Sequence, residues 1–303
     1  MVINQIAIRD INNNFNVIFN KRMDEIKVVY PQIAMVVPSE ASEETYTWFG
    51  QLPSVREWIT SREVVHFSAH AYNIKNKDFE LTISIPRNDI EDDKIGLYST
   101  MLQDMADKAK KQPDNLIFSL LADSFTKKCY DGNPFISDSH YLDGADKKTK
   151  QSNKGVYKLS TESYELARAQ MLTIKGVDGK SLKIVPDLLL VSPQKEGLAR
   201  RILHSETING STNVYKDTAT LMVVPELADT PEVWFMLCTS KAVKPFVFQE
   251  RKPPKLVSKN NDNDDNVFMD KQYIYGVDMR CNAGFGLWHL AFGSTGEEEI
   301  KND

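Results

Sequence analysis

The residues most able to do chemistry gather between Tyr130 and His140. Asp131, Asp138 and His140 place two carboxylates and an imidazole within ten residues, the set that a hydrolase or a metal centre would use. The same segment holds an Asp-Gly and an Asn-Pro pair, which are equally good turn formers. Because a turn explains this composition without any reaction, a cytosolic hydrolase using Asp131, Asp138 and His140 is kept only as an alternative.

Other patterns depart from the motifs that they imitate. His66 and His70 have the spacing of a zinc-binding helix, but Phe67 stands where the catalytic glutamate belongs and the segment alternates as a strand does. Residues 262–266 imitate the start of a calcium-binding loop without its turn glycine or bidentate glutamate. Residues 284–286 lack the third glycine of a dinucleotide fingerprint. We therefore predict no catalytic residue, no cofactor and no metal.

The composition is that of an ordinary globular protein. The chain has 303 residues, 41% of them hydrophobic, so it can bury a substantial core. No apolar run is long enough to cross a bilayer and the start lacks a secretory leader, so we expect a cytosolic chain with no membrane partner. The formal charge of −5, with acids and bases interspersed, is atypical of a dedicated nucleic-acid binder. The three cysteines are widely separated, which favours reduced thiols.

Residues 1–45 have the pattern of an arm rather than of a domain. One apolar helical stripe runs through the segment with little else to pack on, and its members are Ile11, Phe15, Ile18, Phe19, Met23 and Ile26. A stripe without its own core needs a partner, either elsewhere in the chain or in a neighbouring subunit.

A long β-hairpin is predicted next. Apolar and polar residues alternate through 79–85, and 63–72 is the expected partner strand across a turn at 73–77. An isolated hairpin is marginal in water, so this one must pack on other elements or on another subunit.

A long helix followed by an α/β region is predicted for the rest of the chain. The helix spans about 92–127, begins at the acidic caps Asp92 and Asp93, and is kinked or restarted at Pro113, which gives a rod of roughly 50 Å. Further helices are predicted at 160–175 and 192–204, strands at 183–191, 220–224, 233–238, 243–248, 267–277 and 285–292, and polar loops at 142–155 and 252–266.

Ordered pieces of the sequence resemble the major head subunit family of Mu-like phages and prophages. The pieces are 46–58 (YTWFGQLPSVREW), 76–80, 90–94 with Gly96 and Tyr98, 130–132 with His140, 275–280 and 284–288. They span nearly the whole chain in the same order, and this shared order makes the resemblance specific.

The resemblance implies an α+β chain with the major capsid fold of tailed phages, herpesviruses and encapsulins. In that fold an arm leads to an extended loop, then to a peripheral domain on a spine helix, and an axial domain surrounds the capsomer axis. The implied division is 1–45 N-terminal arm, 46–88 extended β-hairpin loop, 89–135 peripheral domain with spine helix, 136–235 axial domain and 236–303 return to the peripheral domain.

The resemblance also implies a major capsid protein, not an enzyme, that self-assembles as pentamers and hexamers into the icosahedral shell enclosing phage DNA. Expected partners are other copies, a scaffold, a head protease, a portal, a decoration protein and packaged DNA contacted without sequence specificity. The expected location is the virion, after assembly in the bacterial host cytoplasm. A nonviral compartment shell of the encapsulin type, which would load a cargo enzyme, stays as an alternative.

Several residues are candidates for subunit contacts, because aromatic residues and arginine concentrate at interfaces and the arm and the hairpin lack cores of their own. They are Phe15, Phe19, Trp48, Phe49, Arg56, Trp58, Lys75 and Lys77. Some relatives crosslink through a lysine on the extended loop, where Lys75 and Lys77 stand, but no matching asparagine and acid are identified here.

Overall fold

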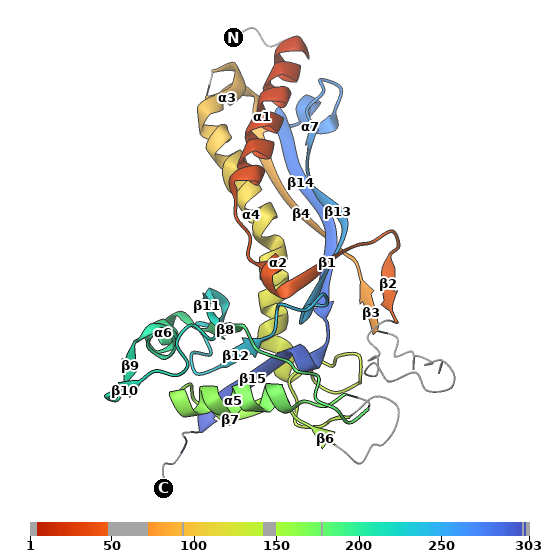
Figure 1. Cartoon of the computed structure of the whole chain (residues 1–303). Coiled ribbons are helices and arrows are strands. Elements are labelled where there is room, and N and C mark those ends of the chain that lie inside the picture. Colours follow the sequence, from red (N-terminus) through yellow and green to blue (C-terminus); the bar gives the residue numbers. More distant parts are fainter. Residues whose placement is uncertain are drawn as a thin grey trace.

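The structure is a computed structural model that describes residues 5–47, 72–92, 94–141, 150–176, 178–298 and 300. Figure 1 shows an elongated molecule with a helix-covered sheet at one end and a second sheet at the other. This mixture of helix and sheet confirms the predicted α+β class. The helices are α1 (Gln5–Glu25), α2 (Tyr30–Ile33), α3 (Arg87–Glu91), α4 (Ile95–Ala122), α5 (Thr161–Thr173), α6 (Glu196–His204) and α7 (Asp265–Phe268).

The first sheet has four strands in the order β1-β13-β14-β4. Strands β13, β14 and β4 are antiparallel neighbours, and β1 runs parallel to β13. The apolar side chains of β4 alternate with exposed polar ones, so only one face of the sheet is covered by helices, as is usual for antiparallel sheets. The strands are β1 (Ala34–Pro38), β4 (Lys77–Pro86), β13 (Phe246–Lys259) and β14 (Gln272–Phe285).

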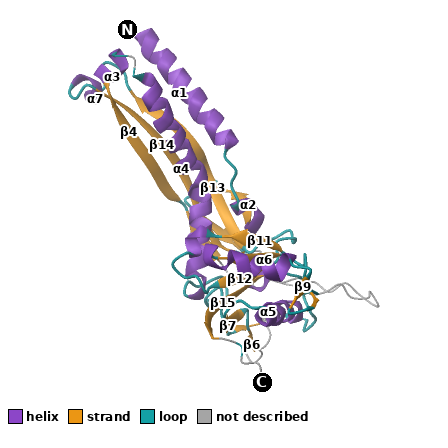
Figure 2. Cartoon of the chain, turned by 90° about the vertical axis from the view of Figure 1, so that its left-hand side faces the viewer, coloured by secondary structure: helices purple, strands orange, loops and turns teal. Residues whose placement is uncertain are grey.

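Helices α1 and α4 lie side by side on that face of the sheet (Figures 1 and 2). The apolar stripe of α1 therefore packs on its own chain, and Phe15 and Phe19 are fully buried there. Arg22 of α1 also forms a two-pronged ion pair with Asp107 of α4, at 2.5 and 2.8 Å. The sequence left open whether the apolar stripe of the arm packs within the chain or on a neighbouring subunit. In the structure it packs within the chain.

The predicted hairpin turn is wrong. The error lies in the turn: residues 73–75 belong to an extended strand, β3 (Tyr72–Lys75), which pairs with β2 (Glu43–Tyr46), and Lys77 already begins β4. Among the described residues β4 pairs with β14, whereas residues 63–71 of the predicted partner lie outside the described part of the chain. Alternation specifies which face of a strand is buried but not which strand lies beside it, and this explains the error. Residues 48–71, including His66 and His70, lie outside the described part of the chain.

The predicted rod is helix α4, whose 28 residues at 1.5 Å each give about 42 Å. Pro113 lies inside the helix and does not restart it. The prediction that Asp92 caps the N-terminus of the long helix is wrong. Asp92 instead caps the C-terminus of α3, and the N-cap residue of α4 is Lys94. Asp93 lies outside the described residues.

The second sheet has five strands in the order β11-β8-β12-β15-β7. All residues of β8 and β12 are buried, because α5 and α6 cover one face and the end of α4 and the first sheet cover the other. Strands buried on both faces appear as continuous apolar runs, which is why the sequence predicted them well. The strands are β7 (Lys154–Tyr157), β8 (Leu188–Val191), β11 (Thr220–Val223), β12 (Trp234–Leu237) and β15 (Ala291–Glu298).

The predicted polar loop at 252–266 is wrong for its first half. Strand β13 continues through this segment to Lys259, with irregular pairing around Pro253 and Pro254. Proline is tolerated there because β1 stops pairing at Glu250 and leaves that side of β13 as an edge.

The remaining strands are short pairs: β5 (His140–Tyr141) with β6 (Lys150–Gln151), and β9 (Thr207–Ile208) with β10 (Ser211–Thr212). Within the described ranges, no helix combines the length and apolar character needed to cross a membrane. The division into arm, loop, peripheral domain and axial domain stays a prediction.

Candidate functional site

The segment singled out for chemistry lies at the junction of the two sheets. It follows α4 through the short helix η1 (Asp123–Phe125), turns back as a small hairpin, and ends in β5. Gly132 in the turn has a φ of +84°, a left-handed conformation that glycine adopts without strain. Phe135 anchors the hairpin by stacking on Phe285, with ring centroids 4.5 Å apart.

The hairpin brings Asp131 and His140 into contact and adds Cys129 to them. Nδ1 of His140 lies 2.6 Å from Oδ2 of Asp131, and the Cys129 thiol donates to Oδ1 at 3.1 Å. The backbone amide of Asn133 donates to the same Oδ1 at 2.9 Å. The imidazole stacks on Trp288, with centroids 4.1 Å apart and planes 2° apart, so its orientation is fixed.

Burial and hydrogen bonds set the charges in this cluster. Burial acts to raise the pKa of Asp131, but hydrogen bonds from His140, Asn133 and Cys129 hold that pKa below its ordinary value. Burial first, and the Asp131 carboxylate next, raise the pKa of the Cys129 thiol. The cluster therefore pairs a carboxylate with a protonated thiol, which is a poor nucleophile.

Asp138 does not join the cluster. Its exposed carboxylate accepts a hydrogen bond from the adjacent Ser139 hydroxyl at 2.6 Å. The His140 side chain is fully buried, and a base must come within hydrogen-bond reach of the proton that it removes. The structure therefore does not assemble Asp131, Asp138 and His140 into a hydrolytic site, and that alternative is corrected.

Sequence reasoning left three neighbours out of this cluster. Cys129 precedes Asp131 by two residues, a spacing that was available as a signal. Trp288 and His289 come from the far end of the chain, and only the fold brings them here. Burial, and then the electrostatic interaction with His140, lower the pKa of His289 to about 3, so His289 stays neutral.

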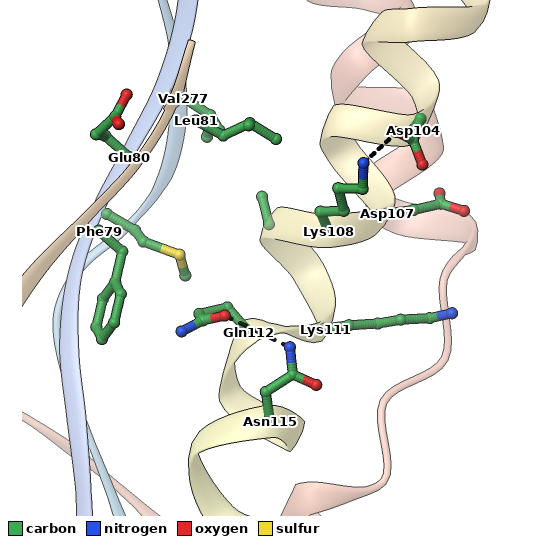
Figure 3. A pocket seen from close by; sticks show the side chains of 12 residues that line it. Phe79, Glu80, Leu81, Asp104, Asp107, Lys108, Lys111, Gln112, Asn115 and Val277 are labelled. Atoms are coloured by element: carbon green, nitrogen blue, oxygen red, sulfur yellow. Dashed lines mark hydrogen bonds and ion pairs between the residues drawn. The ribbon is translucent and has the colours of Figure 1, made fainter. Parts of the chain in front are cut away.

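A groove of about 510 Å³ lies between α4 and strands β4 and β14 (Figure 3). Its sheet side is mostly apolar but includes Glu80 of β4, and charged and polar side chains line its helix side. Asp104 pairs with Lys108 at 2.7 Å, and Asp107 is held by Arg22. The third carboxylate, Glu80, accepts a hydrogen bond from the Thr82 hydroxyl at 2.6 Å, so each acid of the groove already has a partner.

The structure places only some of the predicted contact residues. Phe15 and Phe19 are buried within the chain, so the prediction is corrected for them: they have no surface to offer a neighbour. Lys75 and Lys77 are exposed, at the end of β3 and the start of β4 rather than on a hairpin turn. The other candidates lie outside the described residues: Trp48, Phe49, Arg56 and Trp58.

The sequence model of the family described as "Mu-like prophage major head subunit gpT" matches residues 8–158, 155–227 and 226–302. The chain belongs to this family. A Mu-like relative, the "Major capsid protein" of Escherichia phage Mu, is 31% identical over 302 residues, which is 100% of this chain and 78% of that protein. The "Mu-like prophage FluMu major head subunit" of Haemophilus influenzae is 30% identical over 273 residues, covering 90% of this chain and 68% of that protein. The chain is a Mu-like major head protein.

Solved structures of capsids and particles share the fold of this chain. A chain of the procapsid of bacteriophage JBD30 superposes with a TM-score of 0.62 and 30% identity, over 99% of this chain and 77% of that one. A virus-like particle from Pyrococcus furiosus has a TM-score of 0.54 at 7% identity, over 93% and 98% of the two chains, and supports the fold alone. The predicted major capsid fold is confirmed.

Proposed function

We propose that this major head protein is a structural subunit, not an enzyme, and that copies of it assemble into the icosahedral shell that encloses phage DNA. The observation that carries the proposal is the family match, which runs from residue 8 to residue 302. The likeness to a procapsid chain over 99% of the sequence adds support. Pentamers and hexamers are the repeating units in this proposal.

Exposed apolar side chains at one end of the molecule support contacts between copies. Phe268 is 78% exposed and Met269 is 73% exposed, at the turn that joins β13 to β14. Ile6 and Leu97 are also largely exposed, and they begin α1 and α4 at the same end (Figure 1). Burying a large apolar side chain contributes on the order of 2 kcal/mol, so covering this end with another copy would stabilise an assembly.

The segment between β2 and β3 is the second proposed contact region. The exposed Lys75 ends β3, and the exposed Lys77, two residues on, begins β4. Trp48, Phe49, Arg56 and Trp58 belong to the intervening sequence, whose aromatic and arginine content is typical of interfaces.

Further partners follow from the proposed role. We assign a scaffold and a head protease to assembly, a portal to one vertex, and a decoration protein to the outside of the shell. Packaged DNA would be contacted without sequence specificity, consistent with the interspersed charges and formal charge of −5. The proposed location is the virion, after assembly in the bacterial host cytoplasm.

The double variant Phe268→Asp/Met269→Asp tests assembly. We expect the wild-type chain to form rings, tubes or shells, seen by negative-stain microscopy and as large species in size-exclusion chromatography. The variant should stay small while keeping its circular dichroism spectrum, because two charges cannot be buried without partners. The control is Asp270→Asn, in the same exposed turn, which alters a charge but leaves the apolar pair intact.

Strictly monomeric wild-type protein at every concentration, with a melting temperature raised by a small-molecule ligand, would contradict the proposal. Particles that protect DNA from nuclease support a phage head. Particles loaded with a cargo enzyme would instead favour a nonviral compartment.

A further inference from the structure

We propose that Cys129, Asp131 and His140 form a binding site for a divalent transition metal of the zinc class, which clamps the hairpin after α4 to β5. Each residue offers one ligand atom, and these sulfur, oxygen and nitrogen atoms all lie within 4.8 Å of one another. Thiolate, carboxylate and imidazole are the ligands that zinc takes in proteins. The inference does not depend on shell assembly, because all three residues belong to one chain.

The distances need only a small adjustment to admit an ion. Zinc–ligand bonds are about 2.0–2.3 Å, so ligand atoms around a tetrahedral zinc stand roughly 3.3–3.8 Å apart. Here the His140 nitrogen lies 2.6 Å from Oδ2 of Asp131, and the Cys129 sulfur lies 3.1 Å from the other oxygen, Oδ1. Because one ligand atom from each residue lies within 4.8 Å of the other two, shifts of about 1 Å bring the set to this spacing as the ion replaces the protons between them.

Charge balance favours the ion. The Asp131 carboxylate gives the buried cluster one negative charge. Binding releases the thiol proton of Cys129 to water, and the imidazole binds as a neutral ligand through Nδ1 with its proton on Nε2. Two anionic ligands then balance the dication, so the buried site becomes neutral.

The hydrogen bonds alone do not account for a histidine at this position. Nε2 of His140 is buried and has no hydrogen-bond partner among the described residues. Nε2 is without a described partner in both states, whereas ligation through Nδ1 supplies a gain that a single hydrogen bond to Asp131 does not.

The site is held in place and has an entry path. The turn fixes Cys129 and Asp131 two residues apart, and the stack on Trp288 fixes the imidazole plane. The His140 side chain is fully buried, but the Asp131 side chain is 11% exposed. An ion would reach the site along this carboxylate, and a water from solvent would complete the tetrahedron as fourth ligand.

Titration of the chelator-treated, unassembled chain with Co²⁺ tests the site. We expect a thiolate-to-cobalt charge-transfer band that saturates at about one equivalent, is lost in Cys129→Ser, and is kept in Cys238→Ser, which removes a buried thiol elsewhere. Zn²⁺ should displace the band and raise the melting temperature by about 3 °C or more.

The proposal is overturned if the wild-type chain shows no such band at one equivalent, or if the band survives Cys129→Ser or disappears in Cys238→Ser. If Cys129→Ser fails to fold, Asp131→Asn replaces it and must weaken Co²⁺ binding at least tenfold. A wild-type melting temperature that is the same with chelator and with Zn²⁺ would also overturn it.

Discussion

Replacing Phe15 with alanine tests whether the arm packs within its own chain. Phe15 is fully buried between α1 and the first sheet, and its ring meets Tyr275 edge-on with centroids 5.1 Å apart. Val17 lies on the same helix but is 63% exposed, so Val17→Ala is the matched control.

The expected loss can be worked from this burial. Truncating a fully buried phenylalanine costs about 3–5 kcal/mol, because transfer free energy is lost and a cavity remains. The edge-on contact with Tyr275 is lost as well, so we expect Phe15→Ala to lower the free energy of unfolding by about 4 kcal/mol. Val17→Ala removes little buried surface and should change the free energy of unfolding by less than about 0.5 kcal/mol.

Urea unfolding followed by circular dichroism, at two protein concentrations, measures both variants. Because the contact is intramolecular, the loss in Phe15→Ala should be the same at both concentrations. A loss below about 1 kcal/mol in dilute protein, or one seen only where chains associate, would refute the packing of α1 on its own sheet.

Two further predictions concern single residues. The hydrogen bond from Arg22 holds the pKa of Asp107 below its ordinary value. Above about pH 4, Asp107→Asn should therefore lower the urea midpoint slightly. At lower pH the difference from wild type should vanish, because Asp107 of the wild type becomes protonated. Equal differences across this pH range would contradict it. Gly296 has a φ of +70°, and a Cβ there would lie 2.2 Å from the carbonyl oxygen of Glu232. Gly296→Ala should therefore lower the free energy of unfolding in urea by about 3 kcal/mol. Gly179→Ala, with a φ of +71° and open space around it, should cost only about 1 kcal/mol, and equal costs would show that the clash is relieved.

Local patterns predicted those elements whose burial repeats along the chain. Continuous apolar runs marked β8 and β12, and helical periodicity marked α1, α4 and α5. The polar half of β13 was missed because one face of the first sheet is exposed and its strand side chains are mostly polar there. This half is a strand because it pairs with β14, which follows it in the chain after the turn that contains α7.

The candidate site was half visible in the sequence. Asp131 and His140 were singled out, but Asp138 was grouped with them because closeness in sequence does not say which way a side chain points. After the hairpin the Asp138 carboxylate is exposed beside Ser139, whereas the Cys129 side chain points inward to Asp131.

The sequence by itself determined the α+β class, the rod of α4, the apolar stripe of α1 and, through the order of its motifs, the family. Only the tertiary structure decided that the stripe of α1 is covered by α4 and the sheet, that β4 pairs with β14, and that Trp288 stacks on His140. The physical reason is that periodicity records which side of an element is hidden from water, whereas the choice of covering element depends on contacts between residues far apart in the chain.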